Sequence, residues 1–133
     1  MHALTARITK GLNTGAYLES CDNSGAKVLK FIAVKGGHTK KGRQPSAGIG
    51  DLILASVKKG KPDMRKEVVL AVVVRQRMPF RRPDGTRVFF ADNAAVVVKD
   101  EKGNPKGTLI KGAIAKEIAG RWPAVAKLGS IIV

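Results

Sequence analysis

Residues 71–97 read AVVVRQRMPFRRPDGTRVFFADNAAVV, and this stretch carries the strongest fold signal in the chain. Its first four residues extend an apolar run that begins at Val68 and shows no polar alternation. Most of these side chains are β-branched, so the run predicts a strand that is buried on both faces. Pro83-Asp84-Gly85 predicts a tight turn, because proline presets φ and glycine accepts positive φ. The chain then returns and enters a second apolar strand at 94–98.

The excursion between these two strands, residues 75–90, is predicted to be a protruding β-ribbon. Arginines stand on both of its arms, at positions 75, 77, 81, 82 and 87. Such a cluster is hard to explain by stability, and it is easy to explain if a polyanion lies against the ribbon.

The composition points to the same kind of partner. The chain has 133 residues, enough for one domain, and its net charge is +15 with 44% hydrophobic residues. Residues 35–87 carry 14 basic and 4 acidic side chains. A basic surface kept for solubility is the alternative, and we disfavour it because self-repulsion of this size costs stability. The charge therefore predicts nucleic-acid binding.

The composition also excludes several classes of protein. A single cysteine, Cys21, rules out an internal disulfide and fits a reducing compartment. No apolar run reaches the roughly 18 residues of a membrane span, so we expect a cytoplasmic protein without a membrane partner. The two histidines and Cys21 are scattered without the paired spacing of a zinc site, and no catalytic arrangement stands out. We expect no metal, no cofactor and no enzymatic activity.

The remaining chain predicts a mainly β fold, a five-stranded small β-barrel in one domain spanning 1–133. The expected strands are 16–21, 26–34, 51–57, 68–74 and 94–98. Residues 1–15 are predicted to be an N-terminal arm and 58–63 a basic turn. Short C-terminal helices are expected within 113–133, because Ile114 and Ile118 lie four positions apart.

The aromatic residues are few, and two interpretations of Trp122 remain open. Its ring either packs over the end of the barrel or is exposed at a protein interface, where tryptophan often contributes strongly to binding. The other aromatic residues are too far apart for a base-stacking platform. Recognition is therefore expected to depend on contacts between basic side chains and phosphates, and on RNA shape.

The opening stretch also carries a spaced motif. Ala71-Val72-Val73-Val74 is followed after nine residues by Asp84-Gly85, after four more by Phe90, then by Asn93 and by Val96-Val97. This pattern resembles the signature of the universal large-subunit ribosomal protein fourteen family. DNSGAK at 22–27 and GIGD at 48–51 fall in the order of that family. The arm and the long 35–50 loop resemble its archaeal and eukaryotic branch.

The resemblance implies a fold and a set of partners. The fold would be a five-stranded barrel with a protruding ribbon and short C-terminal helices. The function would be that of a structural constituent of the large ribosomal subunit, which binds large-subunit rRNA. Such a protein would contribute to an intersubunit bridge that touches small-subunit rRNA, beside neighbouring large-subunit proteins. In the archaeal and eukaryotic branch, its C-terminal part would dock the anti-association initiation factor.

Particular side chains are candidates for these contacts. The predicted RNA-binding residues are Lys35, Lys40, Lys41, Arg43, Lys58, Lys59, Lys61, Arg75, Arg77, Arg81, Arg82 and Arg87. The predicted protein-partner residues are Thr108, Lys111, Lys116 and Trp122. We expect Arg82→Ala to weaken RNA binding without changing the fold.

Two other classes of function remain open. One is a free-standing RNA-binding module that acts outside the ribosome. The other is an enzyme acting on nucleic acid, which would need converging carboxylates for a metal ion. Its pool would be Asp51, Asp63, Asp84, Asp92 and Asp100, which stand at predicted turns and strand ends.

Overall fold

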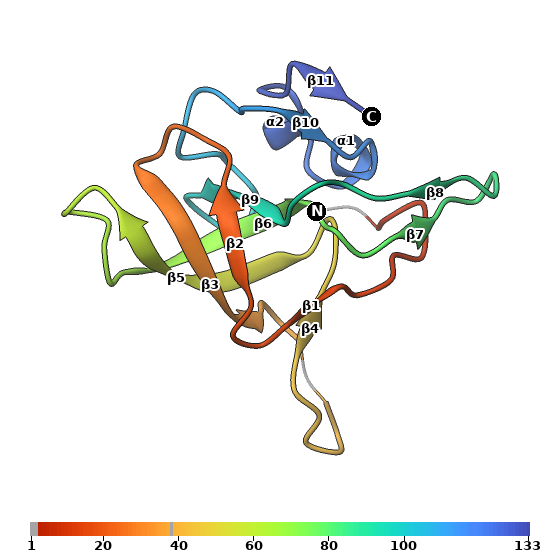
Figure 1. Ribbon diagram of the computed structural model, residues 1–133, viewed down its shortest axis with the longest axis horizontal. Helices are drawn as coiled ribbons and strands as arrows, with labels where there is room; N and C mark the ends of the chain where they lie inside the picture. The colour runs from red at the N-terminus through yellow and green to blue at the C-terminus, as the bar shows by residue number, and fades with distance from the viewer. Residues whose placement is uncertain (1–2, 38) are drawn as a thin grey trace.

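The computed structural model describes residues 3–37 and 39–133, and its centre is a closed β-barrel (Figure 1). The barrel strands are β2 (Tyr17–Ser20), β3 (Ala26–Val34), β5 (Leu52–Gly60), β6 (Val68–Arg75) and β9 (Ala94–Val98). They pair in the order β2-β3-β5-β6-β9, and a parallel pairing of β2 with β9 closes the barrel. The other pairings are antiparallel. The prediction of a five-stranded barrel is therefore confirmed.

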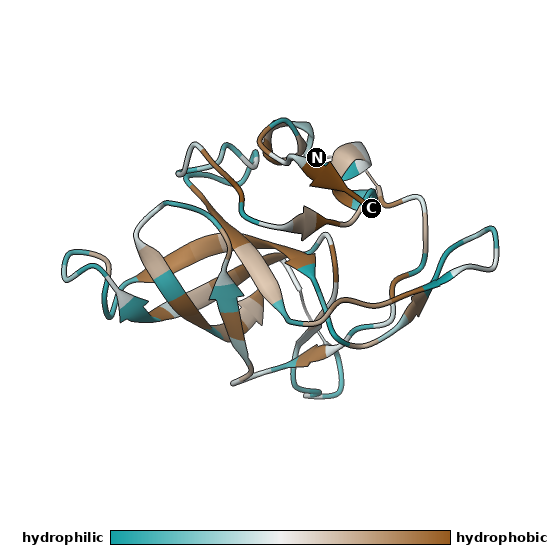
Figure 2. Ribbon diagram, turned by 45° about the horizontal axis from the view of Figure 1, so that its top comes forward, coloured by the Kyte–Doolittle hydropathy of each residue, from teal (hydrophilic) through white to brown (hydrophobic). Residues whose placement is uncertain are grey.

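Strand β9 and residues 71–74 of β6 are buried on both faces, as their apolar runs predict, whereas Val68 at the start of β6 is 60% exposed. Ala71 and Val73 join the cluster inside the barrel, to which all five barrel strands contribute. Val72 and Val74 point the other way, into a second cluster that contains Trp122 and C-terminal isoleucines. Figure 2 shows the apolar colour on the barrel strands and the C-terminal elements, and polar colour on the projecting loops. The barrel therefore needs a cover over one wall, and the C-terminal segment provides it.

This cover combines two short helices with a pair of strands. It contains β10 (Ala113–Ile114), α1 (Glu117–Arg121), α2 (Pro123–Ala126) and β11 (Ile131–Ile132). Strands β10 and β11 pair in parallel. The helices agree with the prediction, whereas the strand pair was not predicted. Ile114 and Ile118 are both buried, although only Ile118 lies in a helix.

The N-terminal segment is anchored to the barrel over part of its length. Strand β1 (Leu12–Asn13) pairs with β4 (Ser46–Ala47), and the side chains of Ile8 and Leu12 are buried in the two clusters. Lys10 also forms an ion pair with Asp51, with Nζ 2.6 Å from Oδ2. The described part of the predicted arm is therefore docked, because its apolar side chains need burial.

The ribbon agrees with the prediction, and the basic turn differs from it in detail. Strands β7 (Phe80–Arg81) and β8 (Arg87–Val88) form the expected ribbon. Strand β5 continues to Gly60, so Lys58 and Lys59 belong to a strand end and not to the turn. A side chain at Gly60 would lie 2.5 Å from the Gly25 carbonyl oxygen, which explains the glycine at this close approach to β3.

Among the described residues, no helix has the length and apolar character needed to cross a membrane.

Candidate nucleic-acid interface

Basic side chains gather on three extensions that leave the barrel in different directions. We call them the basic loop (residues 35–45), the basic turn (58–66, here taken to include the end of β5) and the ribbon (75–90). In Figure 1 the loop points down, the turn points left and the ribbon points right. A polyanion that contacts all three must therefore wrap around the barrel or approach it as several separate segments.

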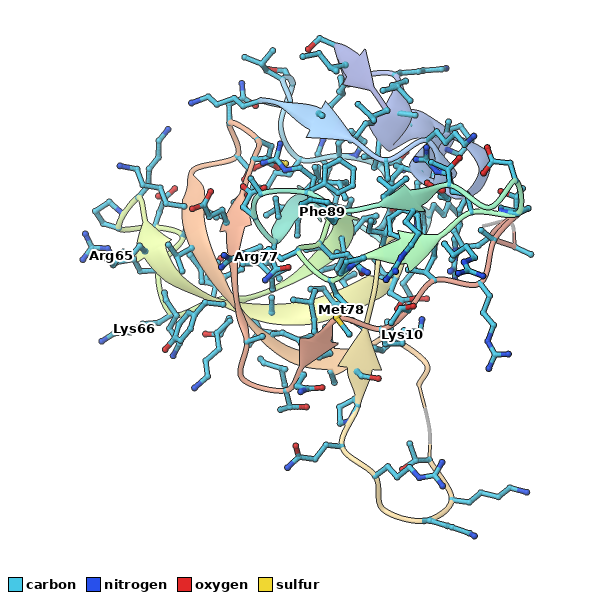
Figure 3. All side chains as sticks on the ribbon, turned by 45° about the vertical axis from the view of Figure 1, so that its right-hand side comes forward. Lys10, Arg65, Lys66, Arg77, Met78 and Phe89 are labelled. Atoms are coloured by element: carbon cyan, nitrogen blue, oxygen red, sulfur yellow. The ribbon has the colours of Figure 1, made fainter. Side chains whose placement is uncertain are left out.

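The basic turn is a dense cluster of exposed cations at one end of the barrel. Lys58, Lys59 and Lys61 are exposed, as an RNA-contact role requires. The structure adds Lys27 and Arg65, which line a hollow together with Lys58 and Lys59. Figure 3 labels Arg65 and Lys66 at this end of the molecule.

Sequence reasoning missed three of these cations, Lys27, Arg65 and Lys66. Lys27 stands 31 positions before Lys58 in the sequence, and only the pairing of β3 with β5 brings their strands together. Lys66 has φ of 65°, a left-handed conformation that costs energy for a residue with a Cβ atom. Its N–H donates to the Val57 carbonyl oxygen at 2.9 Å, which holds the chain in this turn.

The basic loop presents its cations without burying them. Lys40, Lys41 and Arg43 are exposed, and the hydroxyl of Thr39 donates to the Arg43 carbonyl oxygen at 3.1 Å across the loop. Lys35 is also exposed, but its Nζ lies 3.2 Å from Oε1 of Glu101. An ion pair this exposed to solvent contributes little to stability, so Lys35 remains available to another anion.

The ribbon is a two-stranded hairpin with a well-formed turn. Phe80 pairs with Val88 and Arg81 pairs with Arg87. The Asp84 carboxylate accepts the Thr86 N–H at 2.9 Å, and this hydrogen bond lowers the pKa of Asp84. Gly85 has φ of 91°, as the Pro-Asp-Gly turn predicts. Arg77, Arg81 and Arg87 are exposed on this ribbon.

Arg82 does not have the free guanidinium that the sequence predicts. The residue is only 8% exposed. Its Nε donates to Oε1 of Glu117 at 2.8 Å, and its Nη2 donates to the Val133 carbonyl oxygen at 2.6 Å. It also lies over the Phe80 ring. These contacts argue against the expectation that Arg82→Ala would spare the fold, because this side chain joins the ribbon to the C-terminal cover.

Arg75 is also held within the protein. Its side chain is 12% exposed, and its Nη2 donates to Oδ2 of Asp92 at 3.2 Å. Its Nη1 donates to the carbonyl oxygens of Lys111 and Ala113 at 3.2 and 3.1 Å. The structure thus gives Arg75 a bonding role between the end of β6 and the cover. Neither Arg75 nor Arg82 presents a guanidinium to the surface for a phosphate.

The four predicted protein-partner residues divide in a similar way. Lys111 and Lys116 are exposed, and Thr108 is exposed with its hydroxyl accepting a hydrogen bond from Asn23 Nδ2 at 2.8 Å. Trp122 is 1% exposed, and its Nε1 donates to the Gly50 carbonyl oxygen at 2.8 Å. The prediction that Trp122 contacts a partner is therefore wrong, and the alternative of packing over the barrel is the one observed.

The acidic residues and the cysteine show no shared site. Asp51 pairs with Lys10, Asp92 pairs with Arg75, and Asp84 lies at the ribbon tip. Within residues 3–37 and 39–133, no three His, Cys, Asp or Glu side chains form a group suited to a metal ion. Burial raises the pKa of the Cys21 thiol to about 11, as expected for a small core residue.

The chain is similar to known proteins over its full length. A sequence model of the family described as "Ribosomal protein L14p/L23e" matches residues 11–133. Large ribosomal subunit protein uL14 of Nanoarchaeum equitans is 54% identical over 133 residues, which cover 100% of both chains. The proteins of the same name from Thermoplasma acidophilum and Haloarcula marismortui are 52% and 54% identical, again over 100% of each chain.

Proposed function

The chain belongs to the ribosomal protein L14p/L23e family, and we propose that, as a structural constituent of the large ribosomal subunit, it binds large-subunit rRNA through its three basic extensions. The barrel acts as a rigid support that holds the loop, the turn and the ribbon in fixed directions. Phosphate contacts of this kind position a protein on RNA, while RNA shape provides the selectivity.

One observation carries this proposal. Ten of the twelve side chains predicted to bind RNA are exposed. They are Lys35, Lys40, Lys41, Arg43, Lys58, Lys59, Lys61, Arg77, Arg81 and Arg87. The two others, Arg75 and Arg82, bond to carboxylates within the protein. The exposed cations thus lie where a polyanion can reach them.

We also propose a position at the subunit interface, where the protein contributes to an intersubunit bridge with small-subunit rRNA. The C-terminal cover is proposed as its surface for neighbouring large-subunit proteins and for the anti-association initiation factor. Exposed Lys116 lies on this segment, and exposed Thr108 and Lys111 lie just before it. The apolar side chains of Ile131 and Ile132 on β11 are 54% and 50% exposed, which suits a protein partner.

Salt dependence of RNA affinity tests the proposed rRNA contact. If about half of the ten exposed cations contact phosphates, the logarithm of the association constant should fall with the logarithm of salt concentration with a slope of about −4. The measurement uses the full chain and deproteinised large-subunit rRNA between low and physiological salt. An affinity that barely changes over this range would contradict the proposal.

Sedimentation tests the alternative of a free-standing RNA-binding module. A ribosomal constituent should sediment with large subunits and whole ribosomes in a sucrose gradient at moderate salt. A free module would instead remain largely at the top of the gradient. The chain is detected with an antibody across all fractions, and a known large-subunit protein serves as the marker.

A further inference from the structure

The outward face of the ribbon carries two arginines directly opposite each other. Arg81 on β7 and Arg87 on β8 are cross-strand partners, and both side chains are exposed. Side chains on directly opposite residues lie close together, and like charges in such a pair are destabilising. The cross-strand register therefore places two like charges opposite each other at this position.

No carboxylate of the described residues relieves this repulsion. Within residues 3–37 and 39–133, no acidic oxygen lies within ion-pair distance of Arg81 or Arg87. By contrast, Arg75 and Arg82 are paired with Asp92 and Glu117. The Asp84 carboxylate at the tip is used to accept the Thr86 N–H. An external anion between the two guanidinium groups would remove the repulsion.

An exposed aromatic ring stands beside this arginine pair. Exposure alternates along residues 87–90, with Arg87 and Phe89 exposed and Val88 and Phe90 partly buried. The Phe90 N–H donates to the Gln76 carbonyl oxygen at 3.1 Å, so the two arms remain bonded beyond β8. Phe89 lies just after β8, and the alternating exposure of an extended chain continues through it, which places Phe89 on the same face as Arg87.

The ring of Phe89 is 69% exposed, the largest exposed fraction among the large hydrophobic side chains of the described residues. Figure 3 labels Phe89 together with Met78 and Arg77, which stand on the other arm. Phe90, the next residue, packs against the buried cluster that contains Phe80. Core packing therefore accounts for Phe90 and leaves Phe89 without a structural role.

We propose that this face of the ribbon binds one unpaired nucleotide of RNA, with the base stacked on Phe89 and a phosphate held by Arg81 and Arg87. The inference rests on the proposed rRNA-binding function and names one site within it. A nucleotide combines the two features that this face lacks, a planar π-surface and a charge able to accept guanidinium hydrogen bonds. One ring is not a stacking platform, so the site takes a single base.

Substitutions in the full chain test the site, with deproteinised large-subunit rRNA as the probe. Loss of one base stack at Phe89→Ala should weaken affinity by roughly 5- to 150-fold and leave the salt slope unchanged. Phe89→Tyr should bind nearly as well as the parent chain. Arg87→Ala should weaken binding and reduce the magnitude of the salt slope by about 1.

The matched control is Tyr17→Ala, which removes a ring that is 60% exposed on barrel strand β2. This variant should keep its affinity, and melting temperatures should show that all variants fold. Ultraviolet cross-linking of the parent complex should join Phe89 to a nucleotide.

Three outcomes would overturn the inference, and they separate it from the broader proposal. If Phe89→Ala binds like the parent while Arg87→Ala binds more weakly, the chain binds rRNA without this stack. If no variant changes the RNA affinity and the affinity does not depend on salt concentration, the proposed rRNA contact is wrong as well. If Phe89→Ala keeps its RNA affinity but releases a protein from reconstituted subunits, the face is a protein-docking surface.

Discussion

The two faces of the ribbon carry similar residues but have different roles. Phe80 and Arg82 point inward, where Phe80 is 1% exposed and Arg82 bonds to Glu117. Arg81, between them, points outward opposite Arg87. The inner face attaches the ribbon to the C-terminal cover, and the outer face is left for a ligand. Adjacent arginines can therefore have opposite roles, because a strand turns alternate side chains to opposite faces.

The largest expected effect comes from breaking the inner face at Glu117. Glu117→Ala should lower the free energy of unfolding by about 3–5 kcal/mol, because it leaves the buried Arg82 guanidinium without its carboxylate. Urea denaturation measures the change. Arg81→Ala on the outer face is the control: it removes only the like-charge pair with Arg87 and should change stability by no more than about 1 kcal/mol, without destabilising the fold. If both variants lose the same free energy of unfolding, the two faces contribute equally to stability and the prediction is wrong.

The second expected effect concerns Arg75, which bonds to the same cover from the end of β6. Arg75→Met should cost about 1.5–3 kcal/mol, because it removes hydrogen bonds from a charged donor to two carbonyl oxygens. Arg77→Met, two positions further along the chain, should leave stability nearly unchanged and weaken RNA binding instead. Thermal unfolding and RNA affinity are measured for both variants. A stable Arg75→Met variant with weakened RNA binding would mean that Arg75 contacts RNA and does not stabilise the fold.

The third prediction uses Cys21, which lies in the same buried cluster as Phe80. Burial raises its pKa from 9.0 to about 11, so the folded state keeps a proton that the unfolded chain releases. The stabilising contribution of the neutral thiol is complete below pH 9 and declines as pH rises towards 11. The parent chain should lose more stability than Cys21→Ala over this range. Parallel curves for the two proteins would contradict the prediction.

The smallest expected effect is a gain in stability on the outer face. Arg87→Ala removes the like-charge pair with Arg81 and should raise the free energy of unfolding by about 0.2–1 kcal/mol at low salt. The gain should shrink at high salt, since screening already weakens the repulsion. Denaturation at two salt concentrations measures it. A loss of stability would mean that Arg87 supports the fold.

Much of the fold follows from local patterns in the sequence. Residues 26–34 and 94–98 form strands with the predicted bounds, because apolar and β-branched residues favour the extended chain between clear turn signals. The pair β10 and β11 was not predictable in this way. Each strand has two residues, and each exists only because the other lies beside it.

The candidate site was predictable as a class of residues and not as a set of individuals. The sequence identifies an excess of cations between residues 35 and 87 and places them near turns. It does not reveal that Lys27 lies beside Lys58, since the pairing of β3 with β5 brings them together. The spaced motif singles out Phe90 over Phe89, but only the structure shows the reason, which is that Phe90 packs against the buried cluster while Phe89 is exposed.

The barrel strands, the ribbon, the basic character and the family of this protein follow from the sequence alone. These properties depend on residue types, their spacing and their sum, which are visible without coordinates. The folded chain is needed to see that Arg82 is bonded inward while Arg81 faces out, and that Trp122 is buried. The partners of these buried side chains are distant in the sequence: Glu117 is 35 positions from Arg82, and Gly50 is 72 positions from Trp122. Contacts across such separations form only when the chain is folded, so no local pattern records them.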